Sequence, residues 1–339
     1  MRQFKVTKNE EGLSVVKLSG KLLSKAPASL IFKFIRNRNI ELNGKRTRPE
    51  VSLKAGDELS FFLSEETYEK FSDRTPQAMD GEGQAREDKG KRLIRELVLY
   101  EDDNIILLNK PAGLLSQGAE AGETSLNELL LEYLDYSPER AVIKPSICNR
   151  LDKNTSGLIA AGKSAAGLAE LNRGFSERYF KKVYCAICML REFAAPPKGE
   201  YRAYLKKDHK NNKALVSDAP KEGYQEIRTA FSPEGLFDVE APDGQRLKLC
   251  RLNAELITGK PHQIRAHLKF LGFPVLGDRK YFDPLSREIS EELGVKRQLL
   301  HSFSLKFHFP EGSALSYLEG REFAAPLPED LEIKTGRRA

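Results

Sequence analysis

The sequence is poor in cysteine and lacks any long apolar run. Four cysteines among 339 residues are too few for a disulfide scaffold. No apolar stretch approaches the roughly 18 residues that a membrane-spanning helix requires, and no segment has the hydrophobic centre of a secretory signal. We therefore expect a cytoplasmic protein that does not contact a membrane. An apolar share of 40% and a charged share of 31% are typical of a globular chain, here of about one to three domains.

The cysteines and histidines do not have the spacing of a metal site. Cys185 and Cys188 lie within residues 183–190, which are typical of a buried strand, and residues three apart on a strand point to opposite faces. No second C-x-x-C exists to complete four zinc ligands. His262 and His267 are five residues apart, which places them on different faces of a predicted helix. We therefore expect buried thiols, no metal and no redox cofactor.

Positive charge is concentrated in the first part of the chain. Residues 1–64 contain 13 lysines and arginines against 6 aspartates and glutamates, whereas the whole chain has a net charge of +6. Everything after residue 64 is therefore nearly balanced. A small segment that holds the excess positive charge favours contact with a polyanion. The alternative is a solvated basic surface without a partner.

The same segment, residues 1–64, is predicted to fold as a compact module. Residues 29–36 have the apolar density of a helix with one buried face, and the Asn-Gly pair at 43–44 is a strong hairpin signal. Another glycine turn leads into a strand predicted over residues 59–63. This order of helix, hairpin and strand resembles the S4 RNA-binding module. The resemblance implies RNA contacts by four basic residues, which are Lys33, Arg36, Arg38 and Lys45.

The rest of the chain divides by composition. Residues 65–92 are rich in charged and polar residues and are predicted to be a linker with little to bury. Residues 93–330 are strand-rich and are expected to form a second domain, followed by a frayed tail over residues 331–339. Lysines within residues 206–213 could neutralise phosphates, although an exposed turn explains them equally well.

Three stretches of the larger domain carry more charge than their apolar surroundings justify. Arg150 and Asp152 lie on one face of an extended chain between apolar segments, where a charge must be paired or useful. A buried ion pair is the alternative. Tyr184 lies on a strand that enters the core behind basic residues, and a tyrosine there is ordinarily a core residue. Arg265 lies beside the apolar stripe of a helix predicted over residues 261–271, where it can point into a cleft.

Together these stretches resemble the RluA family of pseudouridine synthases. The family motif H-R-L-D-x-x-T-S-G matches residues 149–157, its lysine–tyrosine strand matches residues 182–186, and its G-R-T-H-Q-I-R-x-H segment matches residues 259–267. Further segments that resemble the family are 101–113, 276–278 and 299–302. The resemblance covers roughly residues 95–330. It implies an α+β fold, in which the small S4-like domain precedes a catalytic domain with a mixed, mainly antiparallel sheet flanked by helices and loops.

The resemblance implies conversion of uridine to pseudouridine without a metal or redox cofactor. Asp152 is the implied catalytic carboxylate, which forms a covalent intermediate or stabilises positive charge on the sugar. Arg265 is its implied partner, because an adjacent arginine favours the ionised form of a carboxyl group. Tyr184 is expected to lie against the uracil. The residues implied in holding the RNA are Arg150, Lys182, Lys260, His262 and Gln263.

Two positions depart from the family motifs. Asn149 stands where the family has histidine, and Lys260-Pro261 stands where it has arginine and threonine. Neither position is the implied carboxylate, tyrosine or arginine, so we expect activity to survive. The departures concern the hydrogen bonds that brace the Asp152 loop and one phosphate contact by Lys260.

The expected partner is structured RNA. S4-bearing relatives act mostly on large-subunit ribosomal RNA, which is therefore the expected substrate, with transfer RNA as an alternative. A non-catalytic RNA-binding assembly factor of the same fold is a second alternative. A third is a thiol- or zinc-dependent RNA enzyme built on Cys185 and Cys188. A monomer is the default expectation.

Overall fold

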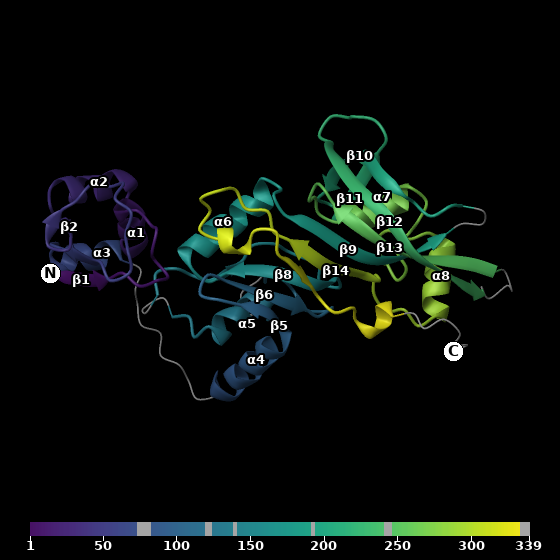
Figure 1. Ribbon diagram of the computed structural model, residues 1–339, viewed down its shortest axis with the longest axis horizontal. Coiled ribbons are helices and arrows are strands. Elements are labelled where there is room, and N and C mark those ends of the chain that lie inside the picture. The colour runs from purple at the N-terminus through teal and green to yellow at the C-terminus, as the bar shows by residue number, and fades with distance from the viewer. Residues whose placement is uncertain (73–82, 119–123, 138–140, 191–193, 241–245, 333–339) are drawn as a thin grey trace.

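The computed structural model describes residues 1–72, 83–118, 124–137, 141–190, 194–240 and 246–332. The N-terminal residues form a small unit at one end of an elongated molecule, and a long sheet runs through the remainder (Figure 1). Within these ranges, no helix has both the length and the apolar character needed to cross a membrane.

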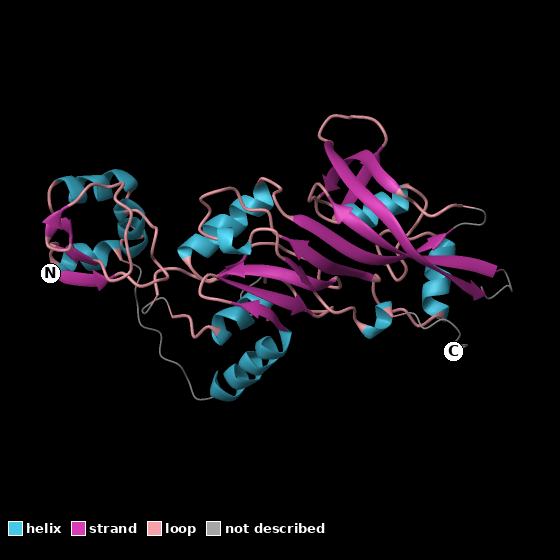
Figure 2. Ribbon diagram, viewed as in Figure 1, coloured by secondary structure: helices cyan, strands magenta, loops and turns pink. Residues whose placement is uncertain are grey.

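The N-terminal unit combines a small sheet with helices (Figure 2). Its elements are, in order, β1 (Arg2–Lys5), α1 (Val15–Leu22), α2 (Ala28–Arg36), β2 (Ile40–Leu42), β3 (Lys45–Arg46), β4 (Glu58–Phe61) and α3 (Glu65–Phe71). The strands pair antiparallel in the order β1-β4-β2-β3. Leu18, Ile35 and Leu59 are almost fully buried in one apolar cluster, so this unit has a core of its own.

The helix and the hairpin predicted for this unit are confirmed. α2 begins one residue before the predicted helix and ends with it at Arg36. Asn43 and Gly44 join β2 to β3 with φ angles of 50° and 69°. A two-residue hairpin turn of type I′ needs positive φ at both positions, which asparagine and glycine tolerate better than other residues. The local sequence therefore determines this turn.

The linker predicted over residues 65–92 is wrong at both ends. Ser64 caps α3 by accepting a hydrogen bond from the backbone N–H of Thr67, and Tyr68 is buried against the ring of Phe61. A second helix, α4 (Gly83–Leu97), buries Ile94 in the core of the larger domain. Among the described side chains, α3 packs Tyr68 and Phe71, and α4 packs Leu93, Ile94 and Leu97, against apolar clusters. Such short apolar patterns give little periodic signal. Residues 73–82 of the predicted linker lie outside the described ranges.

The larger domain is built on one mixed sheet. Its strands are β5 (Val98–Glu101), β6 (Ile105–Lys110), β7 (Ser146–Ile147), β8 (Ser156–Gly162), β9 (Lys181–Leu190), β10 (Gly199–Asp208), β11 (Lys213–Ser217), β12 (Gln225–Glu240), β13 (Arg246–Leu256), β14 (Leu300–Lys306) and β15 (Glu322–Ala324). The order is β11-β10-β12-β13-β9-β14-β8-β6-β5, with β15 on β14 and β7 on β8. Among the described pairings only β14 with β8 is parallel, which confirms the predicted mixed, mainly antiparallel sheet.

Helices flank this sheet. Besides α4 they are α5 (Leu126–Tyr133), α6 (Ala165–Ser176), α7 (Gln263–Phe270) and α8 (Pro284–Glu292), with short 3₁₀ turns at Ser316–Leu318 and Glu329–Leu331. α4, α5 and α7 contribute to one apolar cluster of the sheet. α6 contributes to another, and α8 to a third. The chain therefore has the α+β architecture that the sequence predicts.

The strand predicted around the two spaced cysteines is confirmed, and it is buried on both faces. Tyr184 and Cys188 of β9 belong to the apolar cluster that contains α7 side chains, whereas Cys185 belongs to the cluster on the other face. Successive side chains of a strand alternate between faces, so a spacing of three separates them. The thiols of Cys185 and Cys188 therefore cannot share a metal ion.

The strands β8 and β14 approach each other closely at Gly157. Its φ of +112° is rarely adopted by residues with a side chain, and a Cβ atom there would lie 2.3 Å from the carbonyl oxygen of Ser302. Ser302 is the residue that pairs with Gly157 in the parallel ladder. Glycine is required on both counts. Because Gly157 follows the Asp152 loop directly, this contact also determines where that loop leaves the sheet.

We expect Gly157→Ala to lower the free energy of unfolding by about 2–4 kcal/mol, because the cost of a strained φ adds to the cost of overpacking. Urea unfolding followed by circular dichroism measures the change. Gly235→Ala is the matched control in the same sheet, since a Cβ there meets only the Phe237 ring at 3.5 Å, an ordinary contact. Equal losses in the two variants would contradict the close approach.

Candidate active site

A cavity of about 640 Å³ lies where the three charged stretches of the larger domain meet. The strand β9 contributes one wall, and the loops before β8 and before α7 contribute the others. All eight residues that the sequence predicts for the catalytic domain line it, which are Arg150, Asp152, Lys182, Tyr184, Lys260, His262, Gln263 and Arg265. Folding therefore brings together residues that are up to 115 positions apart, from Arg150 to Arg265.

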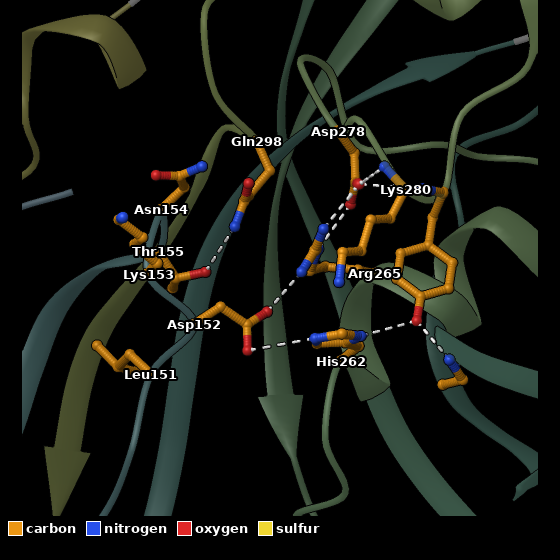
Figure 3. A network of polar contacts seen from close by, with 12 residues as sticks. Leu151, Asp152, Lys153, Asn154, Thr155, His262, Arg265, Asp278, Lys280 and Gln298 are labelled. Atoms are coloured by element: carbon orange, nitrogen blue, oxygen red, sulfur yellow. Dashed lines mark hydrogen bonds and ion pairs between the residues drawn. The ribbon is translucent and has the colours of Figure 1, made fainter. Parts of the chain in front are cut away.

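Arg265, which lines this cavity, connects two carboxylates (Figure 3). Its Nη1 donates to Oδ2 of Asp152 at 2.6 Å. Its Nε and Nη2 donate to the two oxygens of Asp278 at 2.7 and 2.8 Å. The Arg265 side chain is 6% exposed and that of Asp278 is fully buried, whereas that of Asp152 is 29% exposed. Asp152 is thus the one carboxylate of the three-residue group that a ligand in the cavity can reach.

Burial works against these charges, but their mutual contacts outweigh it. Burial lowers the pKa of Arg265. The hydrogen bonds and charges of Asp278 and Asp152 raise it by more, so the net pKa lies above its usual range. Burial likewise raises the pKa of Asp278, while the Arg265 contacts and the backbone N–H groups of Lys280 and Tyr281 bring it below its ordinary value. Arg265 and Asp278 are therefore charged at neutral pH, and the guanidinium keeps its third nitrogen directed at Asp152.

Tyr184 forms part of the cavity wall from the face of β9 that packs against α7. Only 8% of it is exposed, and burial raises the pKa of its phenol to about 12. The phenol therefore stays protonated at neutral pH. It can present an aromatic surface and an O–H donor to a ligand, but it is not a base at that pH.

Lys110 stabilises this site, although the sequence predicts no role for it. Lys110 is fully buried, and its Nζ donates to the carbonyl oxygens of Pro111, Leu114 and Lys153 at 2.9, 2.8 and 3.0 Å. Burial lowers the pKa of Lys110 to about 7, although the charge of Asp152 opposes this. The ammonium group thus ties the strand β6 to the residue after Asp152. A charged residue at the end of an apolar strand was the signal that could have identified it.

The comparisons with known proteins agree with this geometry. The model of the RNA pseudouridylate synthase family matches residues 104–270. The ribosomal large subunit pseudouridine synthase C of Escherichia coli K12 is 26% identical over 333 residues, which cover 96% of this chain and 93% of that protein. The protein of the same name from Vibrio parahaemolyticus is 28% identical over 319 residues, which cover 91% of this chain and 88% of that protein. The region that this family model matches is a domain of the RNA pseudouridylate synthase family.

The fold is shared with a solved structure of the same family. The human protein called RNA Pseudouridylate Synthase Domain Containing 4 superposes with a TM-score of 0.53 at 22% sequence identity. The superposition covers 72% of this chain and 94% of that one. At this identity the likeness concerns the fold alone, which is that of a pseudouridine synthase domain.

Asn149, which replaces the family's histidine, braces the loop before Asp152. Its Oδ1 accepts a hydrogen bond from the backbone N–H of Ala160 at 2.7 Å, and its Nδ2 donates to the carbonyl oxygen of Leu158 at 3.4 Å. Both partners belong to β8. The Asn149 amide therefore hydrogen-bonds both a backbone N–H and a backbone carbonyl of β8. These two bonds attach the loop before Asp152 to the sheet.

Gln263 is predicted from the sequence to contact RNA, and its amide is bonded within the protein. It is buried, and its Oε1 accepts hydrogen bonds from Thr258 Oγ1 and from the backbone N–H of Lys260 at 2.9 and 3.0 Å. Its Nε2 donates to Arg228 O and Thr229 Oγ1 at 3.0 and 3.1 Å. With every hydrogen-bonding position of the amide engaged, Gln263 fixes the loop to β12.

The helix predicted over residues 261–271 begins later than expected. α7 spans Gln263–Phe270, and His262 precedes it in the left-handed region at φ 57°. Gly272 ends the helix with φ +88°, as the sequence predicts. Because His262 is outside the helix, its ring and the Arg265 side chain both face the cavity.

We expect Arg265→Met to lower the free energy of unfolding by about 3–5 kcal/mol, because it leaves the buried Asp278 carboxylate without its cation. Thermal or urea unfolding measures the loss. The control is Arg287→Met, because Arg287 pairs with Glu291 on the surface and is 63% exposed. That control is expected to change stability by no more than about 0.5 kcal/mol. Similar losses in both variants would contradict the buried bridge.

Proposed function

We propose that this protein isomerises specific uridines to pseudouridine in large-subunit ribosomal RNA. The observation that carries the proposal is the partly exposed Asp152 carboxylate, held at 2.6 Å by a buried arginine inside a cavity. The curated relatives that cover most of the chain are called ribosomal large subunit pseudouridine synthases, which supports ribosomal RNA as the substrate.

Asp152 supplies the reactive carboxylate in this proposal. Formation of pseudouridine requires cleavage of the C–N bond between uracil and ribose, rotation of the freed base, and a new bond through carbon. An ionised carboxylate beside C1′ forms a covalent intermediate or stabilises the positive charge that develops on the sugar. Oδ2 of Asp152 is bonded to Arg265, so Oδ1 is the oxygen that meets the sugar.

Tyr184 and Arg150 contact the target nucleotide in this proposal. Tyr184 lies against the uracil as a neutral phenol, and a base stacked on an aromatic ring is stabilised by roughly 1–3 kcal/mol. Arg150 is exposed at the cavity. A uridine inside a helix must leave the stack to reach Asp152, which costs a few kcal/mol, and the Arg150 charge favours the extruded state. Lys182 and Lys260 add positive charge to the same cavity.

The N-terminal unit, residues 1–72, is proposed to bind RNA as an S4-like module. A second cavity of about 650 Å³ lies beside α2 and the following hairpin. The basic residues that line it are Lys33, Arg36, Arg46 and Arg48. None of these four side chains forms an ion pair within the described ranges, so their charge is available to phosphates. Arg38 and Lys45 are exposed nearby in the chain, although they do not line this cavity.

The alternatives have less support from the site. A non-catalytic assembly factor of this fold would bind RNA without needing a carboxylate held by a buried arginine inside a cavity. A thiol- or zinc-dependent enzyme would need Cys185 and Cys188 on one face, but they lie on opposite faces of β9. Transfer RNA presents the same nucleotide chemistry as ribosomal RNA. Ribosomal RNA is preferred because of the names of the relatives.

We expect Asp152→Asn to reduce pseudouridine formation by roughly 10³-fold or more while RNA binding persists, because the amide lacks the charge that the reaction uses. Pseudouridine mapping on large-subunit ribosomal RNA, with and without the added protein, measures this. The matched control is Asp103→Asn, whose carboxylate is 78% exposed and pairs with Lys8 on the surface. A normal rate with Asp152→Asn would contradict the proposed chemistry.

The double variant Arg36→Ala and Arg48→Ala is expected to weaken RNA binding and to reduce its salt dependence. Each lost phosphate contact makes the slope of log K against log salt shallower by about 0.7–0.9. Turnover at saturating RNA should persist, because both residues lie outside the cavity of Asp152. The control replaces Lys17 and Lys21, two exposed lysines of α1. An unaltered slope in the arginine variant would argue against the second cavity as an RNA site.

A further inference from the structure

His262 lies between Tyr281 and the reactive carboxylate, in a place that its role as a general RNA contact does not explain. Its Nδ1 is 2.8 Å from the hydroxyl of Tyr281, and its Nε2 is 3.8 Å from Oδ1 of Asp152 (Figure 3). The His262 side chain is 14% exposed and lines the cavity. A left-handed backbone is uncommon for histidine, and here it aims the ring at Asp152.

The hydrogen bonds around Tyr281 determine which nitrogen of His262 carries the proton. The Tyr281 hydroxyl accepts a hydrogen bond from the backbone N–H of Ala214 at 2.5 Å. Among the described residues, Nδ1 of His262 is the one acceptor that the hydroxyl proton can reach, so we assign Nδ1 as the acceptor. A neutral imidazole that accepts at Nδ1 has its hydrogen on Nε2. His262 therefore presents an N–H donor to the cavity.

The imidazole is neutral at pH 7. Burial lowers the pKa of His262 below its ordinary value of 6.5. Asp152 and Asp278 oppose this shift, whereas Arg265 and Lys280 add to it. These four charged groups face the ring together with the neutral Tyr281 hydroxyl. The N–H donor at Nε2 is thus the form present during catalysis at neutral pH.

The Nε2 donor has no hydrogen-bond acceptor among the described residues. The separation of 3.8 Å from Oδ1 of Asp152 is too long for a hydrogen bond. Oδ1 is also the oxygen that Arg265 leaves free. A ribose whose C1′ approaches Oδ1 has its 2′-hydroxyl on the next carbon, and Nε2 lies only 3.8 Å from that oxygen. We propose that the Nε2–H of His262 donates to the 2′-hydroxyl of the target uridine, so that the site selects ribose over deoxyribose.

This inference rests on the proposed function, and it assigns His262 a specificity role within the same cavity. The 2′-hydroxyl is the group that distinguishes RNA from DNA at a single nucleotide. Tyr281 acts as a positioning residue, since it contacts the histidine and fixes its tautomer without lining the cavity. A purely structural His262 would stabilise the Tyr281 contact but would not respond to a change at the 2′ position.

The test compares two RNA substrates that differ only at the target nucleotide, one with uridine and one with 2′-deoxyuridine. We expect the unaltered protein to prefer uridine by about 10-fold in kcat/KM, the size of one lost hydrogen bond. His262→Ala should reduce this preference to about 2-fold or less. His262→Gln, which restores an N–H donor, should recover part of it, and Tyr281→Phe should give an intermediate value. Where a variant is inactive, the ratio of the two Kd values is compared instead.

His308→Ala is the matched control, because His308 is exposed and pairs with Glu319 away from the cavity. It should keep the full preference for uridine. An active enzyme whose preference is the same with and without His262 would overturn the inference and leave the proposed function intact. An unaltered protein that forms no pseudouridine in either RNA would instead contradict the proposed function, and the role of His262 with it.

Discussion

The guanidinium of Arg265 determines what this site can do. It is bonded on one side to a fully buried carboxylate, Asp278, and on the other to the partly exposed Asp152. Either carboxylate alone would be costly to keep charged in such surroundings, and so would the arginine. Together they compensate one another. The result is a carboxylate at a cavity of mixed polarity, with Oδ2 bonded to the guanidinium and Oδ1 free of that bond.

A functional side chain must be held within about 0.5 Å of its productive position, so this arrangement depends on the backbone that carries Asp152. The close contact of Gly157 with Ser302 determines where the loop leaves the sheet. The ammonium of Lys110 holds the residue after Asp152, and the amide of Asn149 ties the preceding segment to β8. Catalytic geometry of this precision requires support from rigid elements. Here strands supply that support on both sides of the loop.

In the proposed function, the two parts of the chain divide the work of RNA recognition. The N-terminal unit has its own core and carries the excess positive charge, so it can add affinity that does not depend on the reacting nucleotide. The cavity of the larger domain takes the one reacting nucleotide in this proposal. Affinity gained far from the reaction can offset the cost of extruding a base, which is why the two parts act best in one chain.

The sequence by itself determined the local features and singled out Asp152 as the candidate reactive group. The Asn43-Gly44 turn follows from short-range chemistry, the alternation of β9 from its apolar pattern, and the choice of Asp152 from a motif. Only the tertiary structure decided what surrounds Asp152. The bond from Arg265 spans 113 positions, and local patterns carry no information about such contacts. The same holds for Gln263, whose inward orientation is decided by partners on a distant strand.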